Sequence, residues 1–231
     1  MEQKYLNILA DMPLFRHIEP EKLSAITQCL QPVMKSYPAG DMIALEGEPL
    51  YGIGLMMGGT SQIIRESATG HRIIMAQLHV GDPFGEVAAY ARDPVWPVTV
   101  VATSHCEVMF LPTSKLATPC CNACPWHRQL IYNMLEILSE KALSLNKKIG
   151  YLTLKGMRSR ISAYFIDQYK RKDNLSFDLP LKRTEMADLL HVSRPSMSRE
   201  MGRMRDEGII DFERNHITIK DLDALYLAAE S

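Results

Sequence analysis

Between Thr184 and Arg205 the apolar residues recur three to four positions apart, the spacing that places them on one side of a helix. The spacing breaks at Val192, so it predicts two short amphipathic helices around a tight turn. The two apolar stripes are Met186, Leu189 and Leu190 in the first helix, and Met197, Met201 and Met204 in the second.

The residues around the turn are suited to ending one helix and starting the next. Ser193 can cap the second helix, because its hydroxyl accepts an orphan backbone N–H, and Pro195 fits a first turn. His191 stands where such turns often place glycine for a positive φ, a region that histidine tolerates. After Gly208, β-prone runs at 209–212 and 217–219 predict a two-stranded wing.

Basic residues gather in this segment. From Lys182 to Arg205 there are six Lys or Arg and three acids, a balance of +3 in a chain of net charge −1. An arginine fork can donate two hydrogen bonds to guanine O6 and N7, and serine hydroxyls can hold phosphates. We therefore expect a DNA-binding winged helix-turn-helix. The alternative is a helical hairpin with a solvated charged face, but caps, turn and stripes agree at one place.

Residues 37–113 have a different sequence pattern. Short β-prone runs, such as Ile73 to Met75 and Val98 to Val101, are separated by frequent glycines. That density of turns predicts an antiparallel β-roll of the jelly-roll or cupin-like kind, preceded by a short helix over 19–30. The fold class expected is therefore α+β.

A second helical signal follows the roll. Its apolar residues are separated by 4, 3, 4, 3, 4 and 3 positions: Ile131, Leu135, Leu138, Ala142, Leu145, Ile149 and Leu152. This heptad spacing predicts a long dimerisation helix, because a reader of paired half-sites needs a two-fold partner. The alternative is a helix that buries this stripe against its own domain. The expected divisions are a sensing roll over 1–125, a dimerisation helix over 126–152 and a reader over 153–231.

Composition fits a globular protein of two domains: 231 residues, 46% hydrophobic and 23% charged. The N-terminus lacks a basic leader with an apolar core, and no apolar run approaches the roughly 20 residues of a membrane helix. We expect a cytoplasmic protein with no membrane partner.

The segments PFGEVAAY at 83–90 and SRPSMSRE at 193–200, in this order of domains, resemble the Crp/Fnr superfamily of bacterial transcription regulators. The resemblance implies a homodimer that binds a palindromic double-stranded DNA operator, a small-molecule effector in the roll, and RNA polymerase as a partner. It assigns base reading to Arg194 and Arg199 and phosphate contacts to Ser193 and Ser196. Pro195 replaces a glutamate that reads bases in several relatives. The DNA-binding residues expected are Lys182, Arg183, Ser193, Arg194, Pro195, Ser196 and Arg199.

By the same resemblance the effector pocket would contain Gly85, Glu86, Trp96, Pro97, Leu145 and Asn146. Trp96 and Pro97 replace the arginine and serine that contact a cyclic phosphate, and Leu145 and Asn146 replace hydroxyl residues near adenine. A buried phosphate without a cation is costly, so we expect no response to cyclic AMP. The indole and the leucine favour an apolar or aromatic small molecule, unless they merely fill the core.

A thiol cluster precedes the long helix: Cys120, Cys121, Cys124 and His127. It could ligate zinc or part of an iron–sulfur cluster or form a reversible disulfide, but a second ligand pair is missing, and ordinary packed or exposed thiols are the alternative. The cofactor is left open. A haem sensor using His71, His79, His105 or a cysteine is a further alternative. A cupin-like metal enzyme would need clustered histidines, and no hydrolase or nucleotide motif is present, so we do not expect an enzyme.

Overall fold

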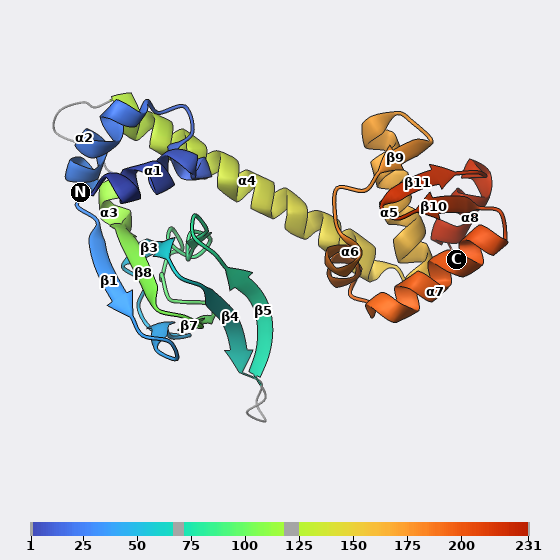
Figure 1. Ribbon diagram of the computed structural model, residues 1–231, viewed down its shortest axis with the longest axis horizontal. Coiled ribbons are helices and arrows are strands. Elements are labelled where there is room, and N and C mark those ends of the chain that lie inside the picture. Colours follow the sequence, from blue (N-terminus) through green and yellow to red (C-terminus); the bar gives the residue numbers. More distant parts are fainter. Residues whose placement is uncertain (1, 67–71, 118–124, 231) are drawn as a thin grey trace. The chain divides into compact units, whose positions relative to one another are not determined.

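The computed structural model describes residues 2–66, 72–117 and 125–230. The chain divides into two compact units, Met1–Glu140 and Lys141–Ser231. The division falls inside the long helix α4 (Pro125–Thr153), which contains the whole stretch predicted to be helical from its heptad spacing. Figure 1 shows the elements of each unit.

The first unit is built on two four-stranded antiparallel sheets, ordered β1-β8-β3-β6 and β2-β7-β4-β5. The expected antiparallel roll is confirmed. The strands are β1 (Val33–Tyr37), β2 (Met42–Ala44), β3 (Gly52–Gly58), β4 (Ser61–Glu66), β5 (Arg72–Leu78), β6 (Pro83–Phe84), β7 (Thr99–Ala102) and β8 (Cys106–Pro112). The helices are α1 (Gln3–Asp11), the 3₁₀ turn η1 (Pro13–Phe15), α2 (Pro20–Leu30) and α3 (Thr113–Ala117). Helix α2 is the helix predicted over 19–30, and a proline opens it.

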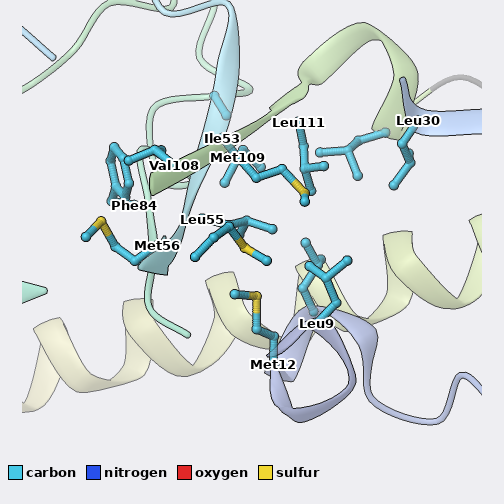
Figure 2. Packing of buried hydrophobic residues seen from close by; sticks show 14 of the residues in the cluster. Leu9, Met12, Leu30, Ile53, Leu55, Met56, Phe84, Val108, Met109 and Leu111 are labelled. Carbon is cyan, nitrogen blue, oxygen red and sulfur yellow. The ribbon is translucent and has the colours of Figure 1, made fainter. Parts of the chain in front are cut away.

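The core of the first unit lies on both faces of the sheet that contains β3. Leu55 is the register partner of Met109, and Met56 that of Val108, so neighbouring pairs point to opposite faces. All four side chains are fully buried. Leu9 of α1 belongs to the same apolar cluster, which Figure 2 shows from close by. Helices therefore cover one face of this sheet, and the interior of the roll covers the other.

Aromatic rings fill the interior of the roll. The ring centroid of Phe84 lies 5.7 Å from that of Trp96 and 6.2 Å from that of Phe110. Phe84 also lies against Gly54 of β3, where an added Cβ would overlap its ring. Glycine at 54 is therefore a packing requirement.

The second unit has a three-stranded antiparallel sheet ordered β10-β11-β9 and four helices besides the end of α4 in its described residues. The elements are α5 (Met157–Lys172), β9 (Ser176–Asp178), α6 (Arg183–Leu190), α7 (Arg194–Asp206), β10 (Ile210–Glu213), β11 (His216–Ile219) and α8 (Leu222–Glu230). Met186, Met197, Met201 and Met204 are at most 1% exposed and pack with Phe165 of α5. The predicted winged helix-turn-helix is confirmed.

The wing has one strand more than the sequence indicated. β9 pairs with β11, and Phe177 is the register partner of Ile217 on the buried face. With three residues and only one buried side chain, β9 is too short to show an alternating pattern in the sequence. The third strand ties the wing to the end of α5, whose Lys172 ammonium donates to the Asp178 carbonyl at 2.8 Å.

Replacing Gly54 by alanine should destabilise the roll by about 1–3 kcal/mol, because the new methyl group overlaps the Phe84 ring in a filled interior. Thermal unfolding followed by tryptophan fluorescence measures this, since Trp96 and Trp126 both lie in the first unit. Gly150→Ala is the control: no heavy atom lies within 4 Å of its added Cβ, and the residue lies in the second unit, so the transition of the first unit should stay unchanged. An unchanged melting temperature for Gly54→Ala would contradict the packing described.

Candidate functional site

The turn between α6 and α7 has the geometry that the sequence predicted. His191 has φ 52°, in the left-handed region, and α6 ends there. The backbone N–H of Val192 returns to the Ala187 carbonyl at 3.0 Å, which closes the turn. Left-handed backbone at a helix end satisfies carbonyls that would otherwise lack donors. The turn thus fixes where α7 begins relative to α6.

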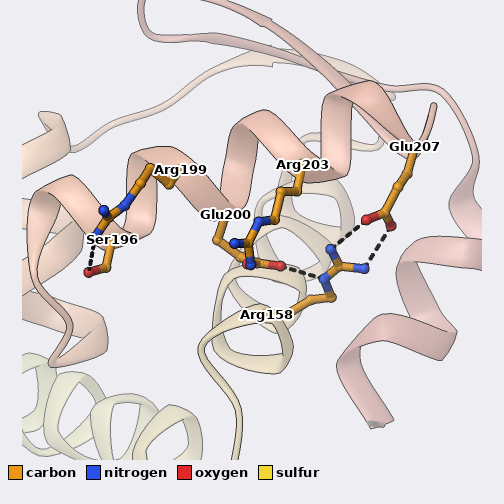
Figure 3. Close-up of polar contacts among 6 residues, drawn as sticks. All are labelled: Arg158, Ser196, Arg199, Glu200, Arg203 and Glu207. Carbon is orange, nitrogen blue, oxygen red and sulfur yellow. Dashed lines mark hydrogen bonds and ion pairs between the residues drawn. The ribbon is translucent and has the colours of Figure 1, made fainter.

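Helix α7 begins with a chain of hydrogen bonds on its exposed side. The Ser193 hydroxyl accepts from the Ser196 N–H at 3.3 Å, as an N-cap does, and donates to the Ser196 hydroxyl at 2.7 Å. The Arg199 guanidinium donates to that same Ser196 oxygen at 3.2 Å (Figure 3). Arg194 and Pro195 are exposed in the first turn. The structure therefore places five of the predicted DNA contacts on one helix start.

The opposite side of α7 is buried by its three methionines, which determines the side that faces outward. Helix α6 is held by Arg160 of α5, which donates to the Leu190 carbonyl at 3.2 Å and to the Leu154 carbonyl at 3.0 Å. Arg160 thus joins the end of α6 to the chain just beyond α4. No local pattern in the sequence indicated this role, because the partner carbonyls lie in other elements.

Lys182 and Arg183 differ in their surroundings. Lys182 is exposed, and its backbone N–H donates to the Glu185 carboxylate at 2.7 Å. Arg183 is half-buried: its guanidinium donates to the Arg214 carbonyl at 2.8 Å and lies 5.2 Å from the Phe212 ring centroid. Burial lowers the pKa of Arg183. Arg183 therefore already joins α6 to the wing, whereas Lys182 points its charge to solvent.

The residues of the predicted dimer seam are largely exposed on α4. Exposed fractions are 57% for Leu135, 55% for Leu145 and 58% for Ile149. Ile131, Ala142 and Leu152 are also exposed, and Leu138 is half-buried. In contrast, Leu130 and Met134 of the same helix pack into the roll, and Asn133 donates to the carbonyls of Leu14 and Arg16 at 2.8 and 2.7 Å. One face of α4 thus belongs to the roll, and a second apolar face is open.

The predicted effector residues of the roll come together around Trp96. A Cβ at Gly85 would lie 2.6 Å from Trp96 Cζ3, so the indole rests on the glycine. Trp96 is 7% exposed, and its backbone N–H donates to the Glu48 carbonyl at 2.9 Å. Glu86 is buried, and Pro97 is exposed. The indole therefore occupies the space directly above Gly85.

Leu145 and Asn146, the other two expected pocket residues, lie on the part of α4 that belongs to the second unit. Both are exposed. Gly85 belongs to the first unit, so the place of Leu145 and Asn146 in the effector pocket stays a prediction.

A hollow of about 390 Å³ adjoins Trp96 at the edge of the roll. Aromatic and aliphatic side chains make up most of its wall: Val33, Lys35, Tyr37, Ile43, Pro49, Tyr51, Gly52, Trp96, Phe110 and Pro112. Lys35 brings one cation, with its ammonium 5.7 Å from the Phe110 ring centroid. Burial raises the pKa of Tyr37. Of these residues the sequence indicated only Trp96, because β1 and β8 lie far apart in the chain and form the wall together.

Three of the four candidate metal ligands, Cys120, Cys121 and Cys124, lie outside the described residues, as does His71. His127 is buried, with Nε2 3.1 Å from the Lys115 carbonyl. His105 contacts the Ser36 hydroxyl at 2.9 Å, and His79 lies 3.8 Å from Asp82. Across residues 2–66, 72–117 and 125–230, no three His, Cys, Asp or Glu are grouped to hold a metal. The metal, redox and haem sensors remain hypotheses.

A Ser–His–Asp chain occurs on the wing. His216 Nε2 lies 2.8 Å from the Ser176 hydroxyl, and His216 Nδ1 lies 2.8 Å from the Asp178 carboxylate. The order of contacts is that of a hydrolytic triad. However, the side chain of Asp178 is 79% exposed, so water screens it, and the three residues stand on the open face of a small sheet. These contacts are therefore made at the surface, in contact with solvent.

Two family comparisons match the two units. Residues 159–227 match the Crp-like helix-turn-helix domain, and residues 34–119 match the cyclic nucleotide-binding domain. The chain is 25% identical to the CRP-like cAMP-activated global transcriptional regulator of Mycobacterium tuberculosis, over 94% of this chain and 96% of the relative. It is 22% identical to the global nitrogen regulator of Synechocystis, over 86% of this chain and 89% of that protein.

Among solved structures, the Thermus thermophilus catabolite activator protein matches with a TM-score of 0.54 at 19% identity, over 94% of this chain and 98% of that one. A sensing roll and a winged helix-turn-helix define the class of effector-controlled DNA-binding regulators. The chain belongs to the Crp/Fnr superfamily of transcription regulators. In the part of the chain that the structure describes, no helix combines the length and apolarity needed to cross a membrane.

Proposed function

We propose that this regulator binds a palindromic operator as a homodimer, with one α7 helix of each protomer in the major groove. The observation that carries the proposal is the two-sided character of α7. Its methionine side is buried, whereas Ser196 and Arg199 lie on the side away from the methionines and Arg194 is exposed in the first turn. A helix presented in this way fits the major groove, which admits one α-helix. For such a regulator we propose action in the cytoplasm and RNA polymerase as a partner.

The exposed residues of α7 divide between two tasks. Arg194 and Arg199 carry forks that can bind guanine, so we assign base reading to them. Ser193 and Ser196, at the positive end of the helix, suit phosphate oxygens. Pro195 can offer only an apolar contact, for example to a thymine methyl group. Lys182 supplies charge without base specificity, and Arg183 reaches DNA only if it leaves the wing.

Arg199→Ala and Arg194→Ala should each cost about 1–3 kcal/mol at the operator and relax the preference at one base pair. Lys182→Ala should weaken binding to operator and scrambled duplexes equally, because a phosphate contact is independent of sequence. Fluorescence anisotropy with an operator obtained by selection from random duplexes measures both effects. If the arginine variants lost affinity uniformly across sequences, base reading would be assigned to the wrong residues.

The exposed apolar face of α4 supports the homodimer. A face of leucine and isoleucine at heptad spacing is costly to leave in water and is suited to pairing with a copy of itself. Alanine at 142 would let two such helices approach closely. The predicted interface consists of Ile131, Leu135, Leu138, Ala142, Leu145, Ile149 and Leu152.

Leu145→Glu should convert the dimer to a monomer, since it places two carboxylates in one apolar seam. Leu143→Glu is the matched control: Leu143 is 62% exposed and Leu145 55%, but Leu143 lies outside the heptad positions. Sedimentation equilibrium gives the mass of each. Dimers in both variants, or monomers in both, would contradict the proposed seam.

For the signal, we propose an apolar or aromatic small molecule in the roll and not cyclic AMP. Trp96 covers Gly85, and the adjoining hollow has predominantly apolar walls with a single lysine. A cyclic phosphate at Gly85 would meet an indole instead of a cation. Ligand pockets of a few hundred Å³ are commonly lined in this apolar way.

Isothermal titration with cyclic AMP should give no binding heat up to about 1 mM, because an indole in place of a cation leaves desolvation of the phosphate uncompensated. The Mycobacterium tuberculosis relative, which is named as cAMP-activated, serves as the positive control under identical conditions. Micromolar binding to this chain would overturn the proposal for the effector and leave the proposal for DNA binding intact.

A further inference from the structure

One arginine of α5 holds a carboxylate of α7 and the carboxylate of Glu207, the residue that caps the end of α7. Arg158 donates through Nε to Glu200 Oε1 at 2.6 Å, and through Nη1 and Nη2 to the two oxygens of Glu207 at 2.7 and 2.8 Å. Figure 3 shows the guanidinium between the two acids. The remaining oxygen of Glu200 accepts from Arg203 at 3.3 Å. Arg158, Glu200 and Arg203 therefore form one chain of charge-assisted contacts.

The three members of this chain of contacts differ in exposure, and Arg203 is the most exposed. Glu200 has a side chain that is 15% exposed, Arg158 one of 30% and Arg203 one of 71%. Arg203 follows Arg199 by four residues and Ser196 by seven, so the three lie along one side of α7. Arg203 thus continues the polar side of α7 by one further turn beyond the residues that we assign to DNA.

The carboxylate of Glu200 is unfavourable for DNA binding at this position of α7. A carboxylate beside the DNA-facing side of a helix repels phosphates, and it can also draw the neighbouring Arg203 into a closed ion pair. Arg158 weakens both effects, because it compensates the charge and occupies Oε1, which leaves Arg203 only the 3.3 Å contact with Oε2. The hydrogen bonds from Arg158 likewise lower the pKa of Glu207. With Arg158 the four side chains sum to zero charge, and without it to −1.

We propose that Arg203 contacts a DNA phosphate and that Arg158 is the positioning residue that keeps Arg203 available for this contact. The inference rests on the proposed function, since it places Arg203 beside the same duplex. The competing explanation is that Arg158 only fastens α7 to α5. That role would affect stability, but it would leave the number of phosphate contacts unchanged.

The test measures the affinity of the full-length dimer for operator and scrambled duplexes across a range of salt concentrations. Arg203→Gln should weaken both duplexes about five- to tenfold and reduce the salt slope by about one, as loss of one phosphate contact does. Arg158→Gln should do the same, and the double variant should be no weaker than Arg158→Gln alone. Arg158→Lys keeps the charge without the fork and should restore part of the affinity.

Arg205→Gln is the matched control. It also lies on α7, but on the opposite side from Ser196 and Arg203, with its guanidinium 3.4 Å from Asp206 and 5.3 Å from the Phe212 ring centroid. Its salt slope should equal that of the unchanged protein. A change as large as that of Arg203→Gln would show that any arginine of α7 has this effect, and it would overturn the assignment to Arg203.

Two further results with Arg158→Gln would overturn the inference. The first is a lower melting temperature of Arg158→Gln with an unchanged salt slope, and the second is strict additivity in the double variant. If Arg158→Gln does not fold, Glu200→Gln replaces it: binding equal to or tighter than wild type supports the inference, and a loss like that of Arg203→Gln contradicts it. Failure of the unchanged protein to prefer any selected duplex would instead refute the proposed function.

Discussion

The orientation of α7, and with it the exposure of Arg194 and Arg199, depends on one interaction. This interaction is the burial of Met197, Met201 and Met204. These side chains are at most 1% exposed, so α7 cannot rotate without losing several kcal/mol of apolar packing. Because that side is fixed inside, Arg194 and Arg199 are fixed outside. The methionine packing determines the orientation of α7. Smaller contributions come from the turn at His191, the cap at Ser193 and the arginines of α5.

Aromatic side chains fill the interior of the roll. Phe84, Trp96 and Phe110 form a cluster of rings around Gly54 and Gly85, and these glycines leave room for the rings. The same positions that could surround a polar ligand thus form an apolar wall. The single cation near that wall, Lys35, comes from the edge strand β1. Residues 34–119 match the cyclic nucleotide-binding domain, and the wall of this roll is predominantly apolar.

Local features of the sequence were predictable, and contacts between distant residues were not. The helix stripes, the cap at Ser193, the left-handed turn at His191 and the long helix each depend on residues within a few positions, so the spacing revealed them. Arg158 and Glu200 are 42 residues apart, and Arg183 and Arg214 are 31 apart. Such partners are determined by tertiary packing. The sequence did not reveal the wall of the hollow beside Trp96 for the same reason, because residues of several strands form it.

We propose above all that the exposed side of α7 reads guanines in a major groove, once per protomer. Single replacement of each guanine in a selected operator by 7-deazaguanine, which lacks the N7 acceptor, tests it most directly. Affinity should fall at a few guanines in two symmetric half-sites about one helical turn apart, and it should fall no further at one of them in the Arg199→Ala protein. Equal affinity for every substituted operator would contradict it.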